Sequence, residues 1–293
     1  MTSGINLDRL RAAITCSFPE LAAARFTPIV SWDSVAVDVD DRLIFKFPRH
    51  EAAKKRLVAE ASLLAVIRPA VTMPVPDLSL HPGPPLFSRH VKLEGEHLLA
   101  QQYELLPVES RKVLAADMAL FYAQVHSLRA GDMEAAGAGP IEPWLQLEDI
   151  LRRAWPVLPP DLRRYAERTV SAWQQLRPDP YGTTYGFFDG HGWNMAFDHG
   201  SNRLNGIYDF ADSGFGPRHQ EFIYSNWIAP DLTARIVAEY EVLTGLALDR
   251  QRIQLLSGVL RLSELAQLAG DPDHAAPMVQ TVADWAHQER PPD

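Results

Sequence analysis

The 293-residue sequence contains a single cysteine, Cys16. One cysteine excludes an intrachain disulfide and a metal site built from a cysteine cluster. No apolar run comes near the roughly 18 residues that a membrane-spanning helix needs, and the amino terminus lacks a basic segment followed by an apolar one. We therefore expect a protein without a membrane partner that works in the cytoplasm.

An excess of basic residues is also lacking. The formal net charge is −9, which argues against a broad nucleic-acid surface. The charge is unevenly distributed: residues 1–93 carry 12 Lys and Arg against 9 Asp and Glu (net +3), and residues 94–293 carry 16 against 28 (net −12). We expect an anionic ligand in the first part and a cationic one in the second. Composition predicts no oligomeric state.

The first third has the pattern of a β-sheet with one helix. Apolar residues alternate over 35–39 and again over 43–47, with Asp40 and Asp41 between them, which predicts a β-hairpin. Residues 50–67 predict a helix. A loop with six prolines between 69 and 85 follows, and 86–93 predicts another strand.

The remainder is predicted to be mainly helical, with one polar β insertion. In the insertion, 184–189 and 193–198 are expected to pair as a hairpin that continues into 204–210. The helical segments are expected near 107–128, 143–154 and 160–176 and over most of 218–288.

Lys46 is an unusual residue for its place in a strand, because it lies between Phe45 and Phe47. An isolated buried ammonium group is very costly, so Lys46 needs a partner. Glu60 has the helical spacing that puts it on the same face as Leu57 and Leu64. We predict an ion pair between Lys46 and Glu60. The alternative is a lysine that extends to water from an edge strand beside a peripheral glutamate.

A polar turn, residues 29–35, precedes the lysine strand and contains Ser31 and Ser34. Such a turn can offer backbone N–H groups and hydroxyls to a phosphate. It contains no glycine, so an ordinary hairpin turn is the alternative.

The polar insertion carries Asp189, Asn194 and Asp209. Two carboxylates and an amide on adjoining strand ends suit Mg²⁺, a cation that prefers oxygen ligands. Phosphoryl transfer uses a lysine that orients the phosphates, an Asp and an Asn that hold Mg²⁺, and an Asp that receives the acceptor's proton. With Lys46 and Glu60 placed earlier, the chain supplies this set in the required order.

The chain resembles the aminoglycoside phosphotransferase family of small-molecule kinases. The stretch Phe187–Asn194, F-F-D-G-H-G-W-N, is similar to the family signature H-G-D-x-H-x-x-N, and I-Y-D-F-A-D-S-G over 207–214 is similar to its metal motif. The first third is closest to the 2''-phosphotransferase branch. This similarity rests on S-W-D-S-V-A-V from 31, L-I-F-K-F-P from 43, A-E-A-S-L-L from 59, and the later P-V-P-D and V-K-L-E-G-E segments.

The resemblance implies an α+β, bilobal, protein-kinase-like fold. The smaller lobe would comprise residues 1–93, with the nucleotide-binding sheet and one helix. The larger lobe, 94–293, would be mostly helical and would hold the catalytic loop, the metal site and the substrate-binding helices.

The resemblance also implies roles. Asp189 would be the catalytic base, and Asn194 and Asp209 the Mg²⁺ ligands. Lys46, held by Glu60, would contact the phosphates of ATP or GTP, which is the co-substrate. The sequence does not distinguish the two nucleotides. The remaining nucleotide-binding residues would be Ser31 and Ser34 in the phosphate loop and, in the segment that meets the purine, His90 and Lys92.

The predicted reaction moves the γ-phosphoryl group to a hydroxyl of a small molecule, an aminoglycoside or another cationic or sugar-like acceptor. Glu221, Trp227 and Asp231 are the candidate acceptor contacts. The segment 221–231 is largely apolar, Phe187 replaces the first histidine of the signature, and Ser31 replaces the usual loop glycine.

There are three alternatives, of which the first is motivated by Phe187 and the missing loop glycine. The first is a nucleotide-binding module with little turnover. The second is a kinase of another metabolite, such as an amino alcohol or a sugar. The third is a metal-dependent hydrolase that uses Asp189, His191 and Asp209. The Lys46 and Glu60 pair argues against a hydrolase, which has no need of it.

Overall fold

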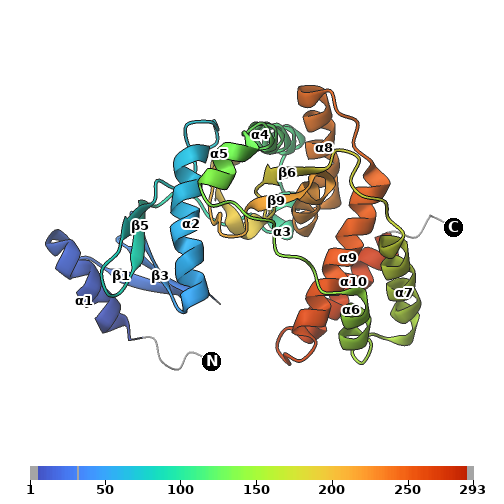
Figure 1. Cartoon of the computed structure of the whole chain (residues 1–293), viewed down its shortest axis with the longest axis horizontal. Coiled ribbons are helices and arrows are strands. Elements are labelled where there is room, and N and C mark those ends of the chain that lie inside the picture. Colours follow the sequence, from blue (N-terminus) through green and yellow to red (C-terminus); the bar gives the residue numbers. More distant parts are fainter. Residues whose placement is uncertain (1–5, 32, 289–293) are drawn as a thin grey trace.

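The computed structural model describes residues 6–31 and 33–288. A five-stranded antiparallel sheet of order β1-β2-β3-β5-β4 lies at one end of the molecule, and a helical body lies at the other (Figure 1). The predicted hairpin over 35–47 is confirmed, with Val35 opposite Phe47. The strands are β1 (Phe26–Val30), β2 (Ser34–Val39), β3 (Leu43–Pro48), β4 (Ser79–His81) and β5 (Phe87–Val91).

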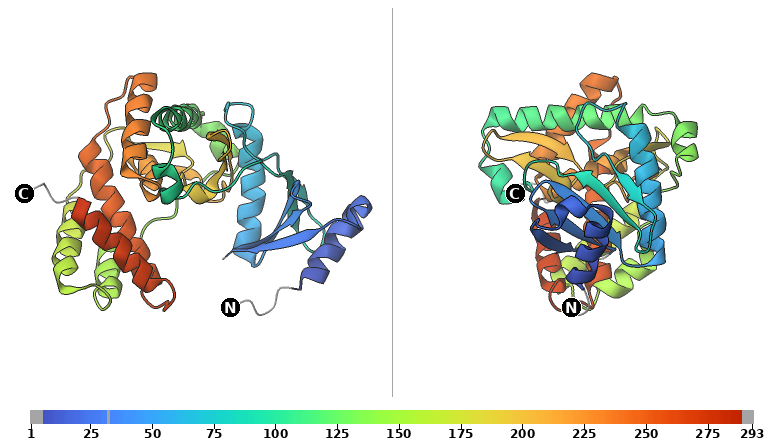
Figure 2. Two further views of the ribbon diagram at one scale, coloured as in Figure 1. Left: turned by 180° about the vertical axis from the view of Figure 1, so that it is seen from behind. Right: turned by 90° about the vertical axis from the view of Figure 1, so that its left-hand side faces the viewer.

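The two faces of this sheet differ because side chains alternate along each strand. In β2, β3 and β5, odd-numbered residues such as Val37 and Phe45 are buried with Ile14 of α1 (Leu7–Ser17) in a small apolar core. The even-numbered residues of these three strands face the opposite side, toward α2 (Glu51–Ile67) and the helical body. Figure 2 shows α1 and α2 on opposite sides of the sheet. The predicted helix over 50–67 is thereby confirmed.

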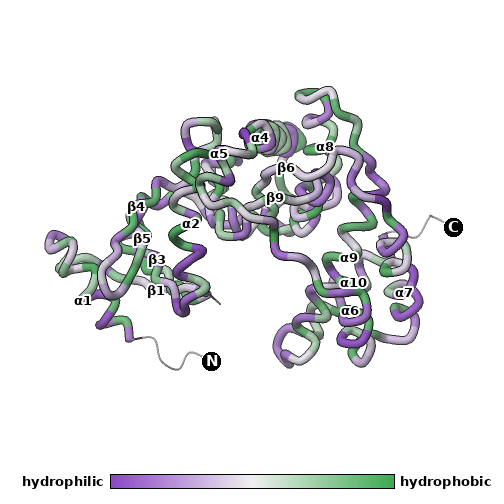
Figure 3. Tube along the Cα trace, in the orientation of Figure 1, coloured by the Kyte–Doolittle hydropathy of each residue, from purple (hydrophilic) through white to green (hydrophobic). Residues whose placement is uncertain are grey.

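The body is held by a larger core in which α4 packs against α8. Hydrophilic residues gather along α7 at its outer edge (Figure 3). None of the helices among the described residues is long and apolar enough to cross a membrane. The helices are α3 (Ala100–Glu104), α4 (Val108–His126), α5 (Ala130–Ala135), α6 (Leu147–Ala154), α7 (Pro160–Gln174), α8 (Pro230–Thr244), α9 (Arg250–Leu268) and α10 (Ala275–Gln288), with a 3₁₀ segment η3 (Arg218–Trp227) before α8.

The pairing expected in the polar insertion is partly wrong. β6 (Thr183–Gly186) pairs with β9 (Gly214–Pro217), not with the next strand. β7 (Met195–Asp198) pairs with β8 (Arg203–Ile207), as expected for the second hairpin. Phe188 adopts a φ of +53°, which turns the chain away from the strand direction after β6. Residues 187–194 therefore form a loop between two small sheets.

The connection between sheet and body is tight. Glu96 exchanges backbone hydrogen bonds of 2.9 and 2.8 Å with Phe197 of β7. Gly95 has a φ of +136°, and a Cβ there would lie 2.6 Å from the backbone of Ala196. Only glycine fits this approach. The sheet is thus fixed directly onto the strand that follows the loop 187–194.

Candidate active site

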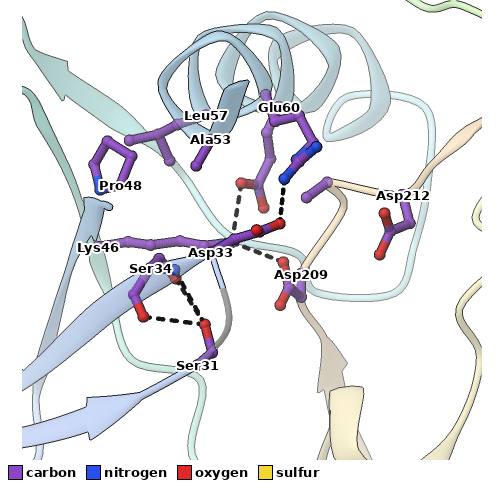
Figure 4. A pocket seen from close by; sticks show the side chains of 12 residues that line it. Ser31, Asp33, Ser34, Lys46, Pro48, Ala53, Leu57, Glu60, Asp209 and Asp212 are labelled. Carbon is purple, nitrogen blue, oxygen red and sulfur yellow. Dashed lines mark hydrogen bonds and ion pairs between the residues drawn. The ribbon is translucent and has the colours of Figure 1, made fainter. Parts of the chain in front are cut away.

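Lys46 lies on the face of β3 that points toward the body, and its ammonium group has two carboxylate partners. Its Nζ lies 3.2 Å from Glu60 Oε2 and 2.7 Å from Asp209 Oδ1 (Figure 4). The predicted ion pair with Glu60 is confirmed. Burial opposes the charge on Lys46, but the two carboxylates outweigh burial and raise the pKa of the ammonium group. Lys46 is therefore a fixed cation.

Glu60 joins α2 to the segment after β8. Its Oε2 faces Lys46, while its Oε1 accepts a 3.0 Å hydrogen bond from the backbone N–H of Phe210. The preceding residue, Asp209, has a φ of +64°. This left-handed backbone, which is uncommon outside glycine, is thus adjacent to a hydrogen bond that spans 150 positions in the chain. The contact brings the first third of the sequence to the metal motif.

The loop 187–194 positions Asp189 through two neighbours. Asn194 Nδ2 donates to Asp189 Oδ2 at 2.6 Å and to the Asp189 carbonyl at 3.1 Å. His191 Nε2 lies 3.0 Å from Asp189 Oδ1, and Asp189 raises the pKa of His191 although burial opposes this. The contact of His191 with this carboxylate is a finding of the structure. Both oxygens of Asp189 are thereby oriented.

Several carboxylates meet where the loop faces Asp209. The pKa of Asp212 is raised to about 6, first by burial and then by the charges of Asp189 and Asp209. A divalent cation would relieve this repulsion. No group of three His, Cys, Asp or Glu around one point occurs within 6–31 and 33–288. Such an open set of oxygen ligands fits Mg²⁺, which usually binds one or two carboxylates together with substrate phosphates and water.

Glu221 supports the loop 187–194 through the loop's backbone. Its carboxylate is fully buried and accepts hydrogen bonds from the backbone N–H groups of Phe187, at 2.9 Å, and Phe188, at 2.8 Å. His126 Nε2 lies 3.1 Å away. The predicted acceptor contact of Glu221 is therefore wrong, because no solute can reach this carboxylate. A Cβ at Gly186 would lie 2.1 Å from Glu221 Oε2, so this position also requires glycine.

The other two predicted acceptor contacts lie in η3 and α8. Asp231 receives hydrogen bonds from Tyr103 at 2.7 Å and Arg235 at 2.9 Å, with Arg111 3.8 Å away. All three partners are on Oδ2 and the side chain is 45% exposed, so its contact with a substrate ammonium stays a prediction. Trp227 is half-buried, and the guanidinium of Arg261 lies 4.5 Å from its ring. Its contact with an acceptor stays a prediction.

A cavity of about 540 Å³ opens between the sheet and the body, lined by Ile44, His90, Leu93 and Tyr208 among others. The imidazole of His90 lies with Nδ1 2.9 Å from the Val91 carbonyl, which assigns its proton to Nδ1. Burial, aided by the charge of Lys46, lowers the pKa of His90. The ring is therefore neutral.

Lys92 also lines this cavity, but its ammonium group is engaged elsewhere. It pairs with Asp38 at 2.7 Å and with Asp41, and the Lys92 N–H donates to the Arg42 carbonyl at 2.9 Å. A contact with a nucleotide through its side chain would break these pairs. The predicted contact of Lys92 with a nucleotide can therefore be made only by its backbone carbonyl.

A second cavity, of about 190 Å³, lies beside Lys46, Ser31 and Ser34. Ser31 and Ser34 close the turn between β1 and β2, with their hydroxyl oxygens 3.1 Å apart and the Ser31 N–H donating to the Ser34 carbonyl at 3.0 Å. Trp32 of this motif lies outside the described residues. The two cavities share both serines and Lys46, so a long ligand with an anionic end can extend through both.

The sequence did not identify two further charged residues beside the site. Arg56 lines the smaller cavity one helical turn before Glu60. Glu264 of α9 is half-buried near His191 and Asp189, and burial raises its pKa to about 7, with Asp189 adding to the shift. The spacing of Arg56 to Glu60 was available in the sequence. No local pattern marks Glu264.

Three solved structures illustrate the similarity of the fold. The GDP complex of wild-type aminoglycoside 2'-phosphotransferase-IIIa has 17% identity and a TM-score of 0.80, over 98% of this chain and 100% of that chain. The streptomycin–ATP ternary complex of APH(2")-IIa has 16% identity and a TM-score of 0.62, over 96% of this chain and 97% of that chain. A macrolide 2'-phosphotransferase from Brachybacterium faecium has 16% identity and a TM-score of 0.64, over 94% of this chain and 99% of that chain. The predicted kinase-like α+β fold is confirmed.

The sequence matches no curated protein significantly. It does match the family described as "Phosphotransferase enzyme family" over residues 25–256, which is most of its length. The resemblance found in the motifs and the predicted enzyme class are confirmed. The chain belongs to this phosphotransferase enzyme family.

Proposed function

We propose that the protein transfers the γ-phosphoryl group of ATP or GTP to a hydroxyl of a small molecule with the help of Mg²⁺. One observation carries the proposal: Lys46 Nζ lies 2.7 Å from Asp209, and Asp209 and Asp189 both lie close enough to Asp212 to raise its pKa. A phosphate-binding cation, candidate metal ligands and a candidate base thus share one cleft. The proposed lobes, 1–93 and 94–293, meet at this cleft.

The two joined cavities support the binding of a nucleotide. Ile44, Leu93 and Tyr208 offer apolar surface to a purine at one end. Lys46 and the hydroxyls of Ser31 and Ser34 would receive the phosphates at the other. Solved structures of relatives contain GDP or ATP, which is consistent with either nucleotide here.

Asn194 and Asp209 would hold Mg²⁺. When bound, the ion neutralises charge on the phosphate oxygens as phosphoryl transfer proceeds. Asn194 already directs its Nδ2 at Asp189, which leaves its Oδ1 for a cation.

Asp189 would receive the proton of the acceptor hydroxyl. The hydrogen bond from Asn194 and the contact with His191 hold its carboxylate in one orientation, so an acceptor can be placed against it with little further ordering. Lys46 would contribute by stabilising charge on the transferred group.

The acceptor we favour carries an ammonium group near its hydroxyl. Glu264 is a half-buried carboxylate close to Asp189, and residues 94–293 carry a net charge of −12. Related structures were solved with kanamycin and with streptomycin. Amino sugars, including aminoglycosides, and amino alcohols are therefore the acceptor classes to test first, with neutral sugars as the contrast.

The experiment is a thermal-shift titration with MgATP and MgGTP, followed by assays of ADP or GDP release with an acceptor library. We expect a shift with at least one nucleotide, loss of turnover in EDTA, and release that depends on an acceptor. Absence of a shift with either nucleotide would contradict the proposal. A shift without release on any acceptor would favour a nucleotide-binding module. Acceptor hydrolysis without nucleotide would favour a hydrolase.

A further inference from the structure

An arginine and an aspartate form an unassigned ion pair inside the smaller cavity. Arg56 lies on α2 four residues before Glu60, so both side chains leave the helix on one face. Its guanidinium contacts Asp33 Oδ2, in the turn between Ser31 and Ser34. Figure 4 shows Asp33 within this pocket together with Lys46.

Asp33 has a second basic partner. His50 Nε2 lies 2.9 Å from Asp33 Oδ1. His50 Nδ1 accepts a 3.2 Å hydrogen bond from the Ala53 N–H at the start of α2, so the ring proton is on Nε2 and is donated to Asp33. Asp33 therefore keeps a hydrogen-bond donor when Arg56 moves away.

A carboxylate is out of place in a turn that receives phosphates, because the like charges repel. Here the Asp33 carboxylate lies where a phosphate would otherwise meet Arg56, and it pairs with the guanidinium itself. The pair is open to water: the side chains are 48% and 40% exposed. Exposed ion pairs contribute little to stability. A phosphate carries more charge than a carboxylate and accepts two parallel hydrogen bonds from a guanidinium, so it can replace Asp33.

The position of Arg56 indicates which phosphate it would meet. The cavity of about 540 Å³ that would hold the base includes Lys46 but neither Arg56 nor Asp212, whereas Arg56 and Asp212 both line the smaller cavity. Arg56 thus lies at the end farthest from the base. The phosphate at that end is the terminal one.

We propose that Arg56 binds the terminal phosphate of the nucleoside triphosphate, and that Asp33 holds the guanidinium in this cavity until the nucleotide displaces it. The inference rests on the proposed function, since it concerns the same cleft. It adds a second phosphate-binding cation and a contact that lowers affinity for the triphosphate.

The test is calorimetric titration of the full chain with MgADP and a non-hydrolysable ATP analogue, or the guanine equivalents if the unaltered chain prefers them. Arg56→Gln should lower the affinity for the triphosphate analogue roughly ten- to a hundredfold, the range of a lost charged hydrogen bond. The affinity for the diphosphate should change less than about threefold. Asp33→Asn should raise the affinity for the triphosphate analogue severalfold. The double variant should bind the triphosphate analogue more weakly than Asp33→Asn does, because it lacks the guanidinium, and at least as tightly as Arg56→Gln, because the repulsion by Asp33 is removed.

Lys54→Gln is the matched control, because Lys54 is a neighbouring exposed cation on α2 that pairs with Glu51. Its affinities should equal those of the unaltered chain, and melting curves should show that all variants fold. Equal weakening by Asp33→Asn and Arg56→Gln would mean that the pair only braces the turn, and would overturn the inference. So would equal losses for the two nucleotides. Failure of the unaltered chain to bind any nucleotide would instead overturn the proposed function and the inference with it.

Discussion

The carboxylate of Glu221 accepts a 2.9 Å hydrogen bond from the backbone N–H of Phe187, at the position where the family signature has a histidine. The neighbouring N–H of Phe188 donates to the other oxygen at 2.8 Å. The loop that carries Asp189 is therefore held through its backbone by a buried glutamate. The side chain of Phe187 is not needed to hold the loop and packs in the apolar core.

Glu221→Gln should lower the turnover number more than nucleotide affinity. A glutamine offers one acceptor oxygen for two backbone donors, and its amide group opposes the remaining N–H. We expect the free energy of unfolding to fall by about 2 kcal/mol and the turnover number by at least about tenfold, since a small displacement of Asp189 is costly. Melting curves, steady-state kinetics and calorimetry measure the three quantities.

Glu239→Gln is the control for that variant, because Glu239 is exposed on α8. It should leave all three quantities unchanged. Unchanged turnover in Glu221→Gln, at a temperature where the variant is folded, would show that Glu221 has no part in positioning Asp189.

Phe187→His, which restores the family signature, should destabilise the protein. Phe187 is fully buried, with its ring 4.8 Å from that of Phe210 and 5.8 Å from that of Phe121. An imidazole among these rings would lack a hydrogen-bond partner, at a cost of roughly 2 kcal/mol or more. The measurement is chemical denaturation, with Phe187→Leu as the apolar comparison. A more active and equally stable histidine variant would show that Phe187 is a defect rather than a packed residue.

Asp189→Asn should abolish transfer while preserving nucleotide binding. An amide cannot accept the acceptor's proton, and loss of a general base costs roughly a hundred- to ten-thousandfold in rate. Lys46 and the two cavities are unchanged, so the dissociation constant for nucleotide should stay within about twofold. Single-turnover kinetics and calorimetry separate the two effects. Substantial residual transfer would assign the base to another residue.

The affinity for a cationic acceptor should rise with pH through the ionisation of Glu264. Its pKa is raised to about 7 by burial and by Asp189, against the opposing charges of His191 and Arg261. Between pH 6 and 8 its ionised fraction grows from about one tenth to nine tenths. KM for the acceptor should fall across this range, and the fall should vanish in Glu264→Gln. Because the pKa of Asp212 is raised to about 6 and Asp189 raises the pKa of His191 above its ordinary value, the ratio of the two profiles is the quantity to compare.

Stability should change in the opposite sense. Because the folded-state pKa of Glu264 exceeds its unfolded value, ionisation disfavours the folded protein, and this loss accumulates as pH rises from about 4.5 to 7. Glu264→Gln should therefore raise the melting temperature at pH 8 and not at pH 4. The same pH dependence of KM in both proteins would remove Glu264 from the acceptor site.

The sequence by itself determined the elements with a local period and the order of the chemical groups. Alternation along 35–47 predicted the hairpin, and helical spacing put Glu60 on the face that meets Lys46. These relationships depend on neighbours within one strand or helix, so short-range geometry is sufficient to predict them. The motif at 187–194 then identified the family.

Only the tertiary structure decided which carboxylates are open to a ligand and which are not. Glu221 is fully buried against the loop 187–194, whereas Glu264, which no pattern marked, is half-buried near Asp189. The partner of β6 is β9, not the next strand. These outcomes depend on packing between segments distant in the chain, such as the Glu60 bond to Phe210, and no local period encodes them. The physical reason is that burial and hydrogen-bond supply are properties of the assembled core, not of the residue alone.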